Sequence, residues 1–198
     1  MNMHRLFAAS AIVLAVLSPA AQAAAQAAAQ AAPLAADNQW NALLVDDVTA
    51  SSFGLEWIDD AGAALHFNFS IAAGFVGRLT VLDTGFSGDE FRVYNGAVLL
   101  GTTSAAVDGD VTGAITFEPA EALANPNFSR GQFWLGAGVH DVTGMLSRSL
   151  AVGGVPLNAT IGALRLEVSP VPEPATLATL LAGLSLLTVR LRRRGNSK

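Results

Sequence analysis

Acidic side chains flank two glycine-containing loops, and loop oxygens of this kind are what a calcium ion requires. Asp83 ends one expected strand, and Asp89 and Glu90 open the next one. Asp108 and Asp110 flank a glycine in a later loop. Calcium takes about six to eight oxygen ligands from carboxylates and loop carbonyls. The five acids are therefore candidate calcium ligands, although neither group has EF-hand spacing and Asp-Gly-Asp is equally an ordinary turn sequence.

The residues around the histidines do not match a known catalytic or metal-binding motif. His66 lies in an alternating apolar stretch, opposite the apolar side chains, and His140 follows a Gly-Ala-Gly turn. The chain contains no Gly-x-Ser-x-Gly elbow and no His-x-x-x-His pair. A serine–histidine–aspartate triad or a carboxylate pair for glycoside hydrolysis depends on proximity in space rather than on spacing, so both stay open as alternatives. We expect no enzyme.

Aromatic side chains offer a second candidate chemistry, which is the stacking of sugars. Trp40, Trp57, Trp134 and Tyr94 are available in the central part of the chain. Trp57 and Trp134 lie in strand patterns, so we expect both in the core. Tyr94, next to the Asn95-Gly96 turn, is the better surface candidate.

The elements that position these residues are expected to be short strands separated by turn sequences. The expected strands are Leu43–Val48, Phe53–Ile58, Leu65–Ile71, Arg78–Asp83, Glu90–Tyr94, Ala97–Thr103, Val111–Glu118, Gly131–Ala137, Val139–Leu146 and Ile161–Val168. Asn95-Gly96 predicts a tight hairpin turn, and Pro119–Asn125 predicts a turn or two of helix. The pattern favours an all-β fold, an antiparallel β-sandwich of jelly-roll type, with a closed barrel as the alternative.

Composition and charge exclude several classes of function. The chain has no cysteine, which removes disulfides, thiolate nucleophiles and cysteine-bound metals. Between Pro33 and Pro170 the sequence holds 15 acidic and 5 basic residues, a formal charge of −10. A domain of this charge repels nucleic acid and anionic lipid. We therefore expect no nucleic-acid partner and no cofactor apart from calcium.

Residues 1–23 predict a removable, helical signal peptide. Arg5 precedes the apolar run Leu6–Leu17. This run is about 12 residues long, too short to cross a bilayer as a helix, which argues against a membrane anchor. Ala21 and Ala23 form a small-x-small cleavage site.

The C-terminal segment carries three consecutive features. The first is the motif Val171, Pro172, Glu173, Pro174 and Ala175, which stays extended because its prolines lack N–H groups and disfavour helix. The second is an apolar run that predicts a single short transmembrane helix over 175–191. The third is the basic end 190–198, where Arg190, Arg192, Arg193 and Arg194 favour the cytoplasmic side.

This three-part tail resembles the PEP-CTERM sorting signal. The resemblance rests on the order of its parts, namely the motif Val171–Ala175, the apolar segment and the terminal arginines. It implies that an exosortase-type transpeptidase of a Gram-negative bacterium cuts near the motif and transfers the protein to the cell surface. Proteins with this signal often occur in species that make extracellular polysaccharide. An ordinary tail anchor is the alternative.

The sequence thus predicts four parts. They are a signal peptide (1–23), an Ala/Gln-rich low-complexity linker (24–36), a β-sandwich domain (37–169) and a sorting tail (170–198). We expect an exported protein that meets the Sec translocon and signal peptidase, then passes through the inner membrane. An exosortase then sorts it to the cell surface or the extracellular biofilm matrix. The alternative is a carbohydrate- or calcium-binding module associated with exopolysaccharide.

Overall fold

The computed structural model describes residues 31–107 and 113–171, which form two predominantly antiparallel β-sheets. The first sheet has the order β1 (Ala31–Pro33), β3 (His66–Ile71), β9 (Gly138–Arg148), β5 (Glu90–Asn95) and β6 (Val98–Thr102). The second has the order β2 (Asn41–Asp46), β12 (Ala159–Pro170), β4 (Phe75–Phe86) and β7 (Ile115–Thr116), and β8 (Arg130–Leu135) also pairs with β4. A separate hairpin joins β10 (Ala151–Val152) to β11 (Val155–Pro156).

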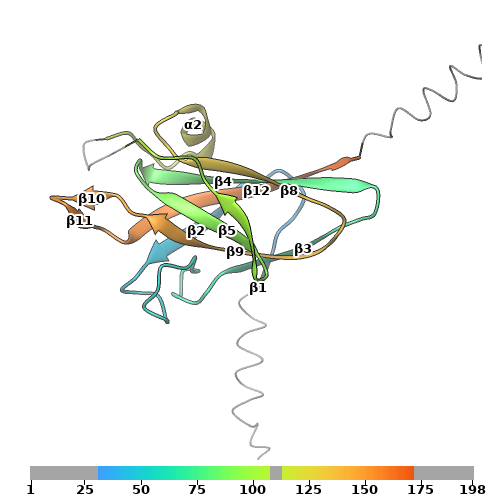
Figure 1. Cartoon of the computed structure of the whole chain (residues 1–198), viewed down its shortest axis with the longest axis horizontal. Helices are drawn as coiled ribbons and strands as arrows, with labels where there is room; N and C mark the ends of the chain where they lie inside the picture. Colours follow the sequence, from blue (N-terminus) through green and yellow to red (C-terminus); the bar gives the residue numbers. More distant parts are fainter. Residues whose placement is uncertain (1–30, 108–112, 172–198) are drawn as a thin grey trace, which may run out of the picture.

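The two sheets share one hydrophobic core, because alternate residues of each strand point to the same side. Figure 1 shows β4, β12 and β8 crossing the upper part of the molecule, with β5 and β9 below them. Both layers contribute to a single cluster of buried side chains, which includes Leu79, Val81, Leu164 and Leu166 from the second sheet and Phe67, Phe91, Val93 and Val142 from the first. Full burial of each such side chain contributes roughly 1.5–3 kcal/mol. The expected all-β class is confirmed.

A second, smaller cluster covers part of the second sheet. The short helix α2 (Pro119–Ala124) begins with a proline, whose fixed φ and missing N–H suit the first helical turn. Its residue Ala122 packs with Phe128 against Leu82 of β4 and Ala163 of β12. This outer packing covers one part of the sheet and leaves other parts for contact with a ligand or with solvent.

Two expected strands are not formed as predicted. Phe53–Ile58 has only isolated bridges, at Glu56 and Ile58, and Phe53 adopts a positive φ of 54° that interrupts a strand. Val111–Glu118 yields only the two-residue β7 within its described part. The other expected strands are present with shifted ends, and the helical turn after Glu118 is confirmed. The hairpin of β5 and β6 is also formed, but its two-residue turn is Gly96-Ala97, one position later than expected, because Asn95 still pairs with Val98.

The folded domain begins earlier than its expected boundary. Ala31–Pro33 pair with β3 as a parallel strand, and Leu34 is buried in the main core. The end of the expected linker 24–36 therefore belongs to the fold. At the other end, β12 runs to Pro170, and the N–H of Val171 donates to the carbonyl of Gly74 at 2.9 Å.

Most of the expected processing features lie outside the described residues. These are the cleavage residues Ala21 and Ala23, the motif residues Pro172, Glu173, Pro174 and Ala175, the span 175–191, and Arg190, Arg192, Arg193 and Arg194. In residues 31–107 and 113–171, no helix has the length and apolar character needed to cross a membrane.

Candidate functional site

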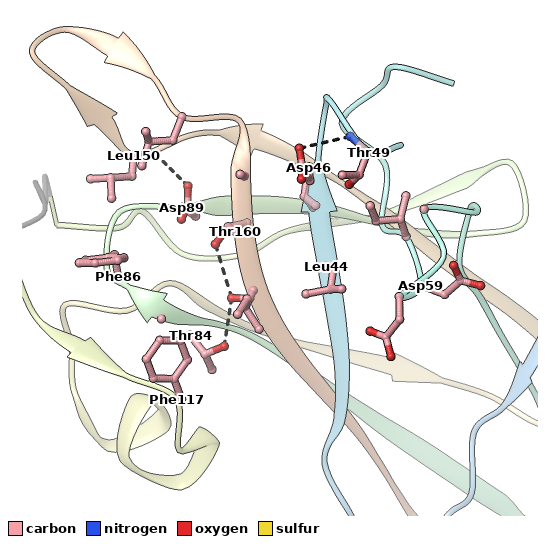
Figure 2. Close-up of a pocket in the computed structure, with 18 of the residues that line it drawn as sticks. Leu44, Asp46, Thr49, Asp59, Thr84, Phe86, Asp89, Phe117, Leu150 and Thr160 are labelled. Atoms are coloured by element: carbon pink, nitrogen blue, oxygen red, sulfur yellow. Dashed lines mark hydrogen bonds between the residues drawn. The ribbon is translucent and has the colours of Figure 1, made fainter. Parts of the chain in front are cut away.

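A cleft of about 630 Å³ opens on the second sheet, beside the start of β12. Leu44 of β2, Ile161 of β12 and Thr84 of β4 line it from three adjacent strands. The loop that follows Ile58, the segment at Phe117 and the hairpin region complete its walls. Figure 2 shows these side chains around the cleft.

One end of the cleft is apolar and partly aromatic. Figure 2 shows Phe86, at the end of β4, and Phe117 on the same side of the cleft, with Leu150 above them. Phe117 is 63% exposed and Leu157 is 43% exposed, although both belong to the lining. Exposed apolar side chains that line a cavity are typical of a ligand site rather than of a core.

The other end carries carboxylates held by backbone hydrogen bonds. Oδ1 of Asp46 accepts from the N–H of Val48 at 3.0 Å, and Oδ1 of Asp59 accepts from the N–H of Ala61 at 2.9 Å. The bond from Val48 is the main cause that lowers the pKa of Asp46 below its ordinary value. Asp60, which is exposed, also belongs to this end. The cleft is therefore apolar at one end and negatively charged at the other.

Asp89 is a buried carboxylate in the lining, close to Leu150. Its Oδ1 accepts the N–H of Leu150 at 2.8 Å, which ties the entry of the β10–β11 hairpin to the start of β5. Burial raises the pKa of Asp89, while the hydrogen bond from Leu150 counteracts that rise. Through this hydrogen bond, the Asp89 carboxyl group stabilises the position of the β10–β11 hairpin relative to β5.

Asp83 is fully buried just behind the cleft, at the inner side of β4. Its Oδ2 accepts two long hydrogen bonds, from the N–H groups of Gly88 and Asp89, each at 3.3 Å. Its Oδ1 has no hydrogen-bond partner among the described residues. Burial, followed by the charge of Asp89, raises the pKa of Asp83 to about 9. Asp83 is therefore uncharged at neutral pH.

The structure brings two of the five expected calcium ligands together. Asp83 and Asp89 are joined through the N–H of Asp89. Glu90 is bound elsewhere, because its Oε1 accepts a hydrogen bond from Arg148 at 3.1 Å. Asp108 and Asp110 lie outside the described residues. Within the part of the chain that the structure describes, no three acidic or histidine side chains form a metal-binding group, so calcium binding stays a prediction.

His66 and His140 are both engaged in contacts within the first sheet. Nε2 of His140 donates to the carbonyl of Gly136 at 2.9 Å, and its Nδ1 lies 3.0 Å from the amide nitrogen of Asn95. Asn95 also accepts the N–H of Asp141 through its oxygen, which assigns its amide nitrogen as the donor to His140. Nδ1 of His66 pairs with Asp141 at 3.0 Å on the half-exposed surface.

The aromatic candidates divide between core and surface, and one expectation is wrong. Trp57 is buried as expected, with its ring edge-on to Phe67 and Phe91. Trp134 is 63% exposed instead of buried, because the alternation of β8 turns Phe133 inward and Trp134 outward. Tyr94 is half-buried, and its hydroxyl lies 3.7 Å from the sulfur of Met145.

The sequence patterns do not predict the cleft, since its walls come from stretches far apart in the chain. Only the acidic end of the cleft has a signal in the local sequence. Asp46 and Asp59 each precede a turn in which their side chains accept backbone N–H groups, and aspartate is common at such positions. Phe117 lay within a strand that is not formed over its expected length.

Comparison with protein-family models, with curated proteins and with solved structures found no match to this chain.

Proposed function

We propose that this chain is an exported, non-enzymatic surface protein whose C-terminal tail is sorted by an exosortase-type transpeptidase. Signal peptidase and the Sec translocon handle the N-terminal segment, and the inner membrane holds the apolar tail during transit. The cell surface or the extracellular matrix is the final location. The basis is the order of signal peptide, all-β domain, Pro-Glu-Pro motif, apolar run and arginines.

The observation that carries the proposal is where the fold ends. β12 pairs with β4 up to Pro170, and Val171, the first residue of the motif, is already 49% exposed. β4 itself begins at Phe75, the partner of Pro170, so the ladder between the two strands ends here, and Pro172 has no backbone N–H to donate. A processing enzyme needs an extended segment next to the folded domain, which is what the Pro-Glu-Pro sequence predicts.

We propose the jelly-roll type for the domain. Without the short strands, the sheet orders become β2-β12-β4-β8 and β3-β9-β5-β6. Consecutive strands mostly change sheets, with β5 and β6 staying together as a hairpin. Eight strands in two such sheets are the pattern of two interlocked Greek keys.

Sorting is tested with the double variant P172A/P174A in a host that has an exosortase. The proposal expects the variant to accumulate in the inner membrane with its tail attached, while the natural chain reaches the surface. The matched control is P156A, which alters an exposed proline of β11 and leaves the motif intact. Equal surface delivery of the natural chain and the double variant would overturn the sorting proposal.

Binding to extracellular polysaccharide is a second candidate, favoured by the position of Trp134. Its partner across the strands is Arg78 of β4, whose Nε donates to Glu167 of β12 at 2.8 Å. An exposed indole beside a guanidinium and a carboxylate offers a flat apolar face together with planar hydrogen-bonding groups. Gln132, which is also exposed, extends the same face of β8.

A pull-down with the host's polysaccharide tests this second candidate. Much less of the W134A variant than of the natural chain is expected to be retained on the polysaccharide. Its folding stability is expected to be unchanged, because the Trp134 indole is already exposed in the natural chain. F53A is the matched control, since Phe53 is 80% exposed and is neither in the cleft nor on β8. Equal retention of W134A and the natural chain would remove Trp134 as a sugar platform.

A further inference from the structure

The cleft beside β12 has the size and the apolar surface of a small-molecule site. Its volume of about 630 Å³ lies within the range of about 300–1,000 Å³ that is usual for ligand pockets. Leu44, Ile58 and Ile161 give it an apolar floor and wall, and Phe86 and Phe117 give it an aromatic end. An apolar body of modest size would displace water from all of these side chains.

The charge of the lining selects against one class of ligand. Every ionisable residue that lines the cleft is an aspartate, namely Asp46, Asp59, Asp60 and Asp89. The excess of acids over bases between Pro33 and Pro170 adds to the same negative potential. Anionic ligands are therefore repelled, and cationic ligands are attracted.

The carboxylates at the rim are fixed in direction without being neutralised. Oδ1 of Asp59 accepts the N–H groups of Ala61 and Ala63, and Oδ1 of Asp46 accepts that of Val48. Among the described residues, neither Asp46 nor Asp59 takes part in an ion pair. Their full negative charge is available to a ligand, and little side-chain entropy is lost on binding.

We propose that this cleft binds a small organic ammonium compound, with its apolar body against Phe86 and Phe117 and its ammonium group at Asp46 and Asp59. Figure 2 shows Phe86 and Phe117 on one side of Leu44 and Asp59 on the other, with Asp46 two residues farther along β2. The ligand therefore needs both parts, a cationic head and an apolar body. This site goes beyond export and sorting, and it does not depend on either.

Three probes of equal length test the proposal, namely hexylammonium, hexan-1-ol and hexanoate. The complete chain is kept in a non-ionic detergent, and ligand-observed NMR titrations are corrected with a protein-free detergent sample. Hexylammonium is expected to bind roughly 3- to 10-fold more tightly than hexan-1-ol, since two exposed ion pairs are gained. Hexanoate is expected to bind least. Raising the salt concentration should reduce the advantage of hexylammonium, because the carboxylates are exposed.

Two variants assign the binding to the two ends of the cleft. D46N/D59N keeps the side-chain oxygens that accept the backbone N–H groups, so the loops stay formed while the charge is lost. It is expected to lose most of the preference for hexylammonium over hexan-1-ol. F117A is expected to weaken both probes by roughly 2- to 5-fold, because it removes apolar contact.

The matched control for charge is D37N/E118Q. Asp37 also accepts a backbone N–H, from Gln39 at 3.0 Å, and both acids are exposed and outside the cleft lining. This variant changes the net charge by the same amount as D46N/D59N and is expected to keep the preference for hexylammonium. The proposal is overturned if no probe binds, if hexanoate binds as well as hexylammonium, or if D46N/D59N retains the preference. Unchanged binding in F117A would also overturn it, since the probe would then lie elsewhere.

Discussion

At the scale of single residues, Asp83 is a buried acid whose charged form the fold disfavours. Its carboxyl group has a pKa of about 9 in the folded chain, against an ordinary value of 3.8. The unfolded chain loses this proton near pH 4, while the folded chain keeps it until about pH 9. This group therefore stabilises the fold most below pH 4, and the free energy of unfolding falls as the pH rises from 4 to 9. The pKa of Asp89 is shifted in the same direction.

The variant D83N should be more stable than the natural chain at high pH. Asparagine resembles the protonated acid in shape and keeps an oxygen for the N–H groups of Gly88 and Asp89. We expect a gain of roughly 1–3 kcal/mol at pH 8 and little difference at pH 4, measured by urea unfolding at both pH values. D37N, at an exposed acid, is the control and should match the natural chain throughout.

Lower stability of D83N at pH 8 would contradict this interpretation and would favour a charged Asp83. Calcium binding then becomes testable on the same samples, because a chelator would lower the melting temperature of the natural chain and leave D83N unchanged.

At the scale of elements, Trp57 fixes the loop before β3 to the strand β9. The N–H of Trp57 donates to the carbonyl of Gly144 at 2.9 Å, and its fully buried ring covers the α-carbon of that glycine. A side chain at position 144 would collide with the indole atoms. The glycine is required because of this close approach, and its φ plays no part.

The variant G144A should therefore destabilise the domain. Forcing a methyl group against a packed ring costs roughly 1–3 kcal/mol, which chemical denaturation would detect as a lower midpoint. G136A is the matched control, because the added methyl group there meets nothing within 4 Å. Equal loss of stability in both variants would mean that the change in unfolding free energy comes from backbone effects and not from the contact with Trp57.

The packing of α2 on the second sheet is a separate stabilising unit. Phe128 is 1% exposed and contacts Leu82, Ala122 and Ala163. F128A should cost roughly 3–5 kcal/mol because it leaves a cavity between α2 and the sheet. F53A, at an exposed phenylalanine, should change the unfolding free energy by less than about 0.5 kcal/mol. A small effect of F128A would show that α2 contributes little to the fold.

The sequence predicts the strands whose burial follows a strict alternation, such as Leu65–Ile71, because that signal is local. It fails at Phe53–Ile58, where Trp57 and Ile58 are buried by contacts from distant strands and not by a ladder of their own. The proximity of Asp83 and Asp89 was predictable, since only a short loop separates them. The cleft was not, because its aromatic end and its acidic end come from stretches that are far apart in the chain.

At the scale of the whole molecule, the long strand β12 separates the two regions to which we assign roles. Ile161, near its start, lines the cleft, and Pro170, at its end, precedes the proposed sorting motif. At about 3.3 Å per residue these points lie roughly 30 Å apart. The cleft therefore lies at the end of β12 that is remote from the proposed tail.

The strand β1 bears on the proposed removal of the signal peptide. The Ala-Gln-Ala sequence of 21–23 recurs at 29–31. Cleavage after Ala23 leaves β1 complete, whereas cleavage after Ala31 would cut into this strand. We therefore expect the mature chain to begin well before Ala31.

The intact mass of the protein from each fraction of its native host tests the central claim most directly. The account predicts a surface or extracellular species that begins near Ala24 and ends between Pro172 and Ala175, with any added mass identifying the attached group. A species in the inner membrane that still carries Arg190–Lys198 would contradict it. The chain would then be a tail-anchored domain and not a sorted surface protein.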